Sequence, residues 1–183
     1  GKYLKEEGFN MNFALNAVTK NANEKRAFKG EDAAIAKLAI AETNAYHENG
    51  IIPVFQTFPT NVLGIDKATS CVIMENVLNS KITGSEDVVC SMSAQAVEKL
   101  RKELGFSGIV ISGPLNDEQI TKKYDAKASA VAAIMAGNDL LYLPSDFKTA
   151  YQGVLEAVKS GSISIEQINN SVGRKLTKKY ENN

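Results

Sequence analysis

Apolar residues along the chain recur with two alternating periods. Short apolar runs, typical of strands, alternate with longer segments in which apolar residues return every three or four positions, as on one face of a helix. The predicted strands span residues 9–14, 51–55, 70–74, 108–112 and 139–143. The predicted helices span residues 31–48, 93–104, 117–136, 146–159 and 164–179, and the polar segment 1–7 is typical of a further helix.

Turn and cap residues support these boundaries. Ser93 is a good N-cap for the helix that follows it, and Gly105 is a typical stop after that helix. The run 108–112 is continuously apolar, which indicates a strand buried on both faces. Pro53 indicates either an edge strand or the start of a strand. The alternation of strands and helices predicts a parallel α/β sheet, and periodicity alone does not choose between a doubly wound sheet and a barrel.

Composition narrows the class of protein. The 183 residues carry 21 basic and 21 acidic side chains with no basic run, so nucleic acid is not expected as a partner. No apolar stretch reaches the ~18–20 residues of a membrane-spanning helix. No targeting segment is recognisable, which leaves the compartment open between cytoplasmic and exported. Cys71 and Cys90 lack metal-ligand spacing and are expected to be buried free thiols. No metal or cofactor motif is found.

Several segments, in chain order, resemble the catalytic barrel of family 3 glycoside hydrolases, especially its β-N-acetylhexosaminidase branch. The family strand N-M-N-F-A-P-V is similar to residues 10–16, and the loop N-R-S-F-G-E-D to residues 25–32. The longest match sets the family's L-R-E-E-L-G-F-D-G-V-V-I-S against residues 100–112. Residues 48–50 and 136–141 resemble E-N-G and A-G-A-D-L-L. The resemblance covers most of the chain.

This resemblance implies an α/β fold with a parallel β-sheet and flanking helices, an incomplete or modified (β/α)8 TIM-barrel-like arrangement. Such barrels take about 250 residues, and the chain aligns from near the family's third strand onward. A second gap follows Pro59, where a family helix is expected to be missing. We therefore expect about six strands, in one domain over residues 1–183 that corresponds to the C-terminal two-thirds of a family barrel.

The resemblance also indicates that the catalytic groups are absent. Retaining glycoside hydrolysis needs a carboxylate nucleophile and a proton donor. The family's nucleophile is the first Asp of S-D-D-L, and the corresponding position here is Gly113, followed by Pro114. The family's proton-donor motif K-H-F-P-G-H-G falls on residues 56–62, where Thr60 and Asn61 replace the last Gly-His.

Some positions that contact sugar in the family fall on residues able to form hydrogen bonds. Arg26 matches a family arginine, and Gln56 and Thr57 replace the Lys-His pair. Asn76 stands where the family has a further His. These four residues are candidate residual sugar-binding positions, whereas a family Asp falls near Val18.

Other ionisable residues are weaker candidates for a catalytic role. His47, the only histidine, is expected on a helix away from the carboxyl ends of the strands. The alternative carboxylates are Glu75, Asp117 and Glu118, with Asp66 as a further candidate. A glycosidase built from them needs a pair about 5–9 Å apart across a cleft. Asp117 and Glu118 are equally typical of a helix N-terminus.

Three functions remain open from the sequence. The first is a non-catalytic family 3-like domain with a structural or carbohydrate-binding role. The second is a glycosidase with unorthodox carboxylates. The third is a protein-interaction module, because a barrel lacking strands leaves a sheet edge that must be covered, either by a second copy of the chain or by an N-terminal segment.

Overall fold

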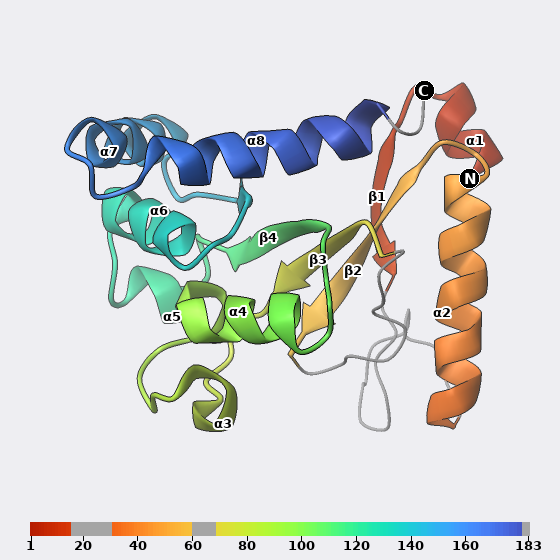
Figure 1. Ribbon diagram of the computed structural model, residues 1–183, viewed down its shortest axis with the longest axis horizontal. Helices are drawn as coiled ribbons and strands as arrows, with labels where there is room; N and C mark the ends of the chain where they lie inside the picture. The colour runs from red at the N-terminus through yellow and green to blue at the C-terminus, as the bar shows by residue number, and fades with distance from the viewer. Residues whose placement is uncertain (16–30, 60–68, 181–183) are drawn as a thin grey trace.

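The computed structural model describes residues 1–15, 31–59 and 69–180. Within them, five parallel strands form one sheet whose order in space is the order in sequence (Figure 1). The strands are β1 (Met11–Leu15), β2 (Ile52–Phe58), β3 (Cys71–Met74), β4 (Ile109–Pro114) and β5 (Leu140–Tyr142). The sheet curls into a half-barrel, which confirms the incomplete TIM-barrel-like fold indicated by the sequence.

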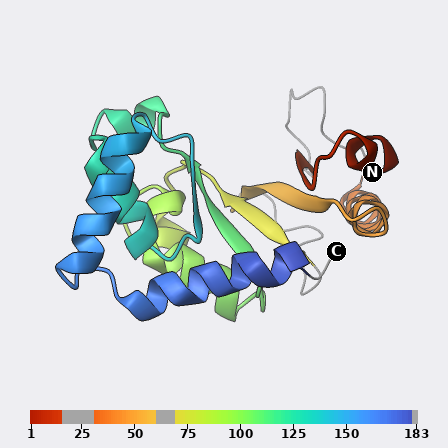
Figure 2. The ribbon, with the colours of Figure 1, turned by 90° about the horizontal axis from the view of Figure 1, so that it is seen from above.

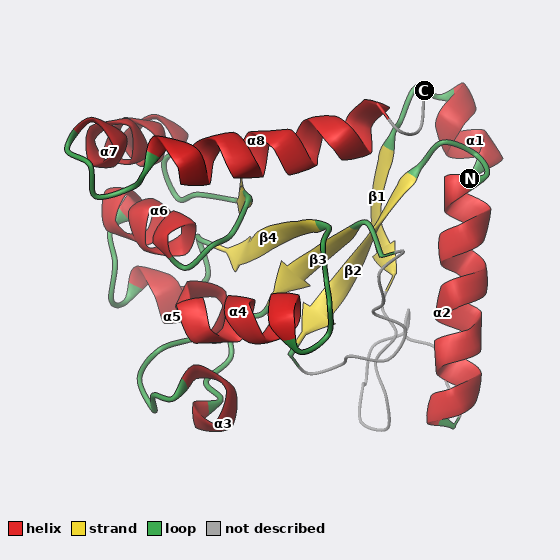
Figure 3. Cartoon of the chain, in the orientation of Figure 1, coloured by secondary structure: helices red, strands yellow, loops and turns green. Residues whose placement is uncertain are grey.

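Helices surround the strands (Figure 3). They are α1 (Lys2–Glu6), α2 (Asp32–His47), α3 (Ser80–Thr83), α4 (Ala94–Lys102), α5 (Glu118–Thr121), α6 (Ala126–Met135), α7 (Phe147–Lys159) and α8 (Ile165–Tyr180), with a 3-10 turn, η1, at Cys90–Met92. Helices α2 and α7 lie at opposite ends of the sheet, and α8 runs from α7 toward the end that holds β1 and β2 (Figures 1 and 2).

The expected number of strands was about six, and the described residues form five. One predicted helix needs correction. The helix predicted over residues 117–136 is two helices, α5 and α6, because Asp125 interrupts it and caps α6 by accepting a hydrogen bond from the Ala128 N–H at 2.7 Å. Of the two alternatives that Pro53 indicated, the structure bears out the strand start: Pro53 is the second residue of β2, which is an interior strand between β1 and β3.

The inner face of the half-barrel is apolar because alternate strand residues point into it. Its buried members come from the three interior strands, and the rings of Phe13 on β1 and Tyr142 on β5 stack with centroids 5.5 Å apart. The curl is therefore tight enough for side chains of the first and last strands to meet across the interior. The buried inner-face residues are Ile52, Val54, Cys71, Ile73, Ile109 and Ile111.

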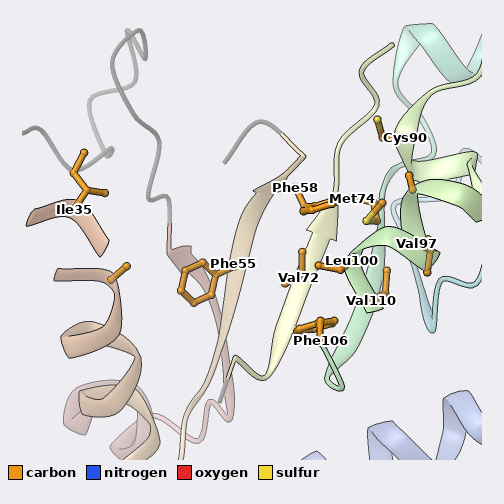
Figure 4. Packing of buried hydrophobic residues seen from close by; sticks show 12 residues of the cluster. Ile35, Phe55, Phe58, Val72, Met74, Cys90, Val97, Leu100, Phe106 and Val110 are labelled. Carbon is orange, nitrogen blue, oxygen red and sulfur yellow. The ribbon is translucent and has the colours of Figure 1, made fainter. Parts of the chain in front are cut away.

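The outer face packs against helices through the intervening strand residues. Leu100 of α4 lies against Val72 of β3, with Val110 of β4 close by (Figure 4). All three side chains are fully buried. Ile35 of α2 and Phe55 of β2 belong to the same cluster. Strand β4 is buried on both faces, as its continuous apolar run predicted.

A buried carboxylate ties α4 and α8 to the sheet. Asp139, whose side chain is 0% exposed, accepts hydrogen bonds from Arg101 Nη2 at 2.7 Å and from the Val110 N–H at 2.9 Å. Its other oxygen accepts from Ser171 Oγ at 2.7 Å and from Arg174 Nη2 at 2.6 Å. Asp139 directly precedes β5, so this cluster lies at the amino ends of the strands, away from a barrel's usual active-site end.

Candidate functional site

The carboxyl ends of the strands surround a cleft of about 420 Å³. This is the end of a barrel where active sites are found, because the loops that follow the strands meet there. The cleft combines aromatic, apolar and polar side chains, which is the usual make-up of a small-ligand site. Its lining residues are Phe13, Ile73, Met74, Glu75, Asn76, Val77, Pro114, Asp117, Gln119 and Tyr142.

Gly113, the expected nucleophile position, lies next to this cleft. It is the penultimate residue of β4 and is buried. The neighbouring Ser112 hydroxyl donates to the Gly113 carbonyl at 2.9 Å and accepts from the Tyr142 N–H at 3.0 Å, so it joins β4 to β5. A glycine at 113 has no side chain that could attack a sugar or transfer a proton.

Asn76 fills the space beside Gly113. Its side chain is a bridge between segments, since Nδ2 donates to the Pro114 carbonyl at 2.8 Å and Oδ1 accepts from Ser91 Oγ at 2.5 Å. The residue is only 7% exposed. A Cβ placed on Gly113 would overlap Asn76 Oδ1 and would lie 2.8 Å from the Met74 carbonyl oxygen. The Asn76 amide therefore has partners within the protein for both of its polar ends.

The bridge continues through two residues that the sequence did not single out. Ser91, in η1, accepts through its carbonyl from Asn138 Nδ2 at 2.8 Å, and Asn138 Nδ2 also donates to the Ala133 carbonyl at 2.7 Å. Both residues are buried. The one available signal was Asn138, which stands where the family pattern A-G-A-D has Ala. Nothing in the local sequence pointed to Ser91.

The alternative carboxylates divide into two kinds. Glu75 and Asp117 both line the cleft. Asp117 is also the N-cap of α5, and its Oδ1 accepts from the Gln119 N–H at 2.8 Å. Glu118 is not part of the lining; it is exposed in the first turn of α5 and pairs with Lys122 at 2.7 Å. The structure thus brings two of the three carboxylates to one cleft.

Several candidate positions lie outside the part of the chain that the structure describes. These include Arg26, Thr60, Asn61 and Asp66, together with Val18. Gln56 and Thr57 belong to β2 near its carboxyl end, but their side chains are also outside the described part.

His47 lies at the opposite end of the barrel, as expected. It ends α2, and its Nε2 is 2.9 Å from the Ser70 hydroxyl, just before β3 begins. Burial and the nearby charge of Lys178 lower the pKa of His47. Both cysteines are buried free thiols, and burial raises the pKa of Cys71 to about 12 and that of Cys90 to about 11. Among the described residues, no group of His, Cys, Asp and Glu could hold a metal ion.

The curled parallel sheet and the cleft at its carboxyl ends define a domain of the (β/α)-barrel class. Residues 62–177, more than half of the chain, match the family described as "Glycosyl hydrolase family 3 N terminal domain". The chain belongs to this family.

Known relatives agree with this assignment. The chain is 22% identical to "Beta-hexosaminidase A" of Pseudoalteromonas piscicida, over 95% of the chain and 38% of that protein. It is similar in structure to a family 3 β-N-acetylglucosaminidase from Paenibacillus sp. str. FPU-7, with a TM-score of 0.89 and 26% identity over 100% of the chain and 42% of the other. A β-N-acetylglucosaminidase from Thermotoga maritima shares the fold, with a TM-score of 0.83 and 18% identity over 97% and 45%. The chain spans less than half of each of these three relatives.

Among residues 1–15, 31–59 and 69–180, no helix is both long enough and apolar enough to cross a bilayer.

Proposed function

We propose that this chain is a non-catalytic family 3 domain with a structural or binding role. The observation that carries the proposal is Gly113, at the β4 position where the family pattern has its nucleophile. The space in which a Cβ of residue 113 would stand is occupied by the bridged Asn76 amide. Catalysis by this family's route requires a carboxylate at that point, so the fold is retained without its reaction.

The cleft supports a binding role with carbohydrate as the ligand class. The Tyr142 ring offers an apolar surface for the C–H face of a pyranose, and the Glu75 and Asp117 carboxylates can accept hydrogen bonds from hydroxyl groups. Arg26, Gln56 and Thr57 remain candidate sugar contacts. Asn76 is a weaker candidate, because both ends of its amide are bonded within the protein.

An assay with an aryl N-acetyl-β-glucosaminide tests the catalytic part of this proposal. The expected result is release of the aryl group at the rate of buffer alone, even at high protein concentration. The beta-hexosaminidase A of P. piscicida serves as the positive control for the substrate. Release that is proportional to protein concentration and survives repurification would contradict the proposal.

A second candidate is a glycosidase that uses unorthodox carboxylates. The favouring observation is that Glu75 and Asp117 line the same cleft. If hydrolysis were found, Glu75→Gln and Asp117→Asn should each abolish it, whereas Glu118→Gln, outside the lining, should leave it unchanged. Activity that persists in both cleft variants would exclude this second candidate.

A third candidate is an interaction module that covers the open edges of the half-barrel. Within the described residues, β1 pairs only with β2 and β5 pairs only with β4, and the residues of β5 are half-buried. Unpaired edges of a parallel sheet favour association with further strands. A second copy of the chain or a preceding segment could supply them. Sedimentation equilibrium over a wide concentration range tests the first option, and a monomer throughout would exclude it.

A further inference from the structure

The Asn76 side chain, just after β3, fills the volume that a side chain at Gly113 of β4 would need. Asn76 follows β3, Gly113 lies within β4, and the amide of the first occupies the space where a Cβ of the second would stand. Of the three atoms nearest to that Cβ, two belong to the Asn76 side chain and the third is the Met74 carbonyl oxygen. The two positions are therefore sterically dependent on each other.

The Asn76 side chain cannot simply swing away to make room. Its Nδ2 donates to the Pro114 carbonyl, and its Oδ1 accepts from Ser91 Oγ. These groups are mostly buried, so a rotation of the amide would leave donors and acceptors without partners in the protein interior. Ser91 is in turn held through its backbone, because its N–H donates to the Glu75 carbonyl and its carbonyl accepts from Asn138.

We infer that Asn76 joins the ends of β3 and β4 to η1 and, together with the Met74 carbonyl oxygen, leaves no room for a side chain at position 113. The inference rests on the proposed function, because it gives a steric reason for the absence of a nucleophile at position 113. Restoring an acid at position 113 alone then produces a destabilised protein, not an active one. Shortening Asn76 removes two of the three close contacts of a Cβ at position 113 and leaves the one with the Met74 carbonyl oxygen.

A double-mutant cycle on thermal unfolding tests the pair. Overpacking of a buried site costs enough for Gly113→Ala to lower the unfolding midpoint by roughly 5–10 °C. Asn76→Ala also lowers the midpoint, because the Ser91 hydroxyl loses its acceptor and the Pro114 carbonyl loses one of its two donors, keeping only the Asp117 N–H. In the Asn76→Ala background, Gly113→Ala should lower it by less than about half as much as in the parent, since only the Met74 carbonyl still crowds the new Cβ.

Gly173→Ala provides the matched control. Gly173 lies in α8, and a Cβ there meets nothing within 4 Å. Its effect should be the same in the parent and in the Asn76→Ala background. Asn76→Ser, with a smaller cavity, serves as the second background if Asn76→Ala fails to fold. Equal effects of Gly113→Ala in the presence and absence of the Asn76 side chain would overturn the inference.

The outcome is independent of the hydrolysis assay. If the parent chain hydrolyses the aryl glycoside, the proposed function fails, whereas the cycle still reports whether residues 76 and 113 exclude each other. If the parent is inactive and the cycle is additive, the proposed function stands and the steric account of it is wrong.

Discussion

Replacing Asp139 by Ala should be among the most damaging single changes outside the cleft. The carboxylate accepts from two guanidinium groups, one hydroxyl and one backbone N–H, and its side chain is 0% exposed. Removal of one partner from a buried ion pair costs about 3–5 kcal/mol, because the remaining charge is left uncompensated. Arg101 and Arg174 retain 24% and 30% exposure, so water can replace part of the loss. We therefore expect about 3 kcal/mol, at the lower end of that range.

Urea unfolding, followed by circular dichroism at the helix band, measures this loss of unfolding free energy. In a separate thermal melt, the midpoint of a chain of this size should fall by roughly 6–12 °C. Asp139→Asn keeps the shape but not the charge and should give an intermediate loss. Glu118→Gln is the control, since it removes one partner of an exposed i,i+4 pair, and such pairs contribute little. A loss below about 1 kcal/mol in Asp139→Ala would refute the view that this carboxylate holds α4 and α8 to the sheet.

Three further predictions concern other parts of the chain. The lowered pKa of His47 means that the unfolded chain binds a proton more readily than the folded chain. The stability that this residue contributes is therefore fully present above about pH 6.5 and is lost as the pH falls below that value and through the lower pKa of the folded state. Unfolding measured at pH 7.5 and 5.5 should show a smaller pH effect in His47→Gln. Cys71 and Cys90 should not react with a thiol reagent at pH 8 in the folded protein, because both thiols are buried and burial raises their pKa values. Both should react in denaturant. Fast labelling of the native chain would contradict their burial. Gly173→Ala should stabilise the protein by about 0.5–1 kcal/mol in urea unfolding, because alanine favours the helix and the space is open.

The sequence predicted the elements well where their signal was local. All five observed strands were expected, because continuous apolar runs such as that of β4 are rarely anything else in an α/β chain. The break between α5 and α6 was missed because Ala-rich helical periodicity obscured the cap at Asp125. The expected number of about six strands followed from an alignment rather than from the residues themselves, and the described part contains five.

The candidate site was predictable only one position at a time. The sequence indicated Gly113 and Asn76 as separate replacements of family residues. Their shared volume depends on β3 and β4 being neighbours, and the bond to Ser91 depends on the fold of the segment after β3. Sequence patterns carry side-chain type and spacing, whereas steric exclusion between residues 37 positions apart exists only in the folded chain.

The central claim is that no side chain of this chain attacks the sugar, and covalent trapping tests it most directly. A retaining glycosidase forms a glycosyl-enzyme intermediate, which an activated fluorinated N-acetylglucosaminide makes long-lived enough to weigh. Intact-protein mass spectrometry after prolonged incubation should show only the mass of the unmodified chain. A mass increase of one sugar, mapped by peptide analysis to Glu75, Asp117 or any other carboxylate, would contradict the account.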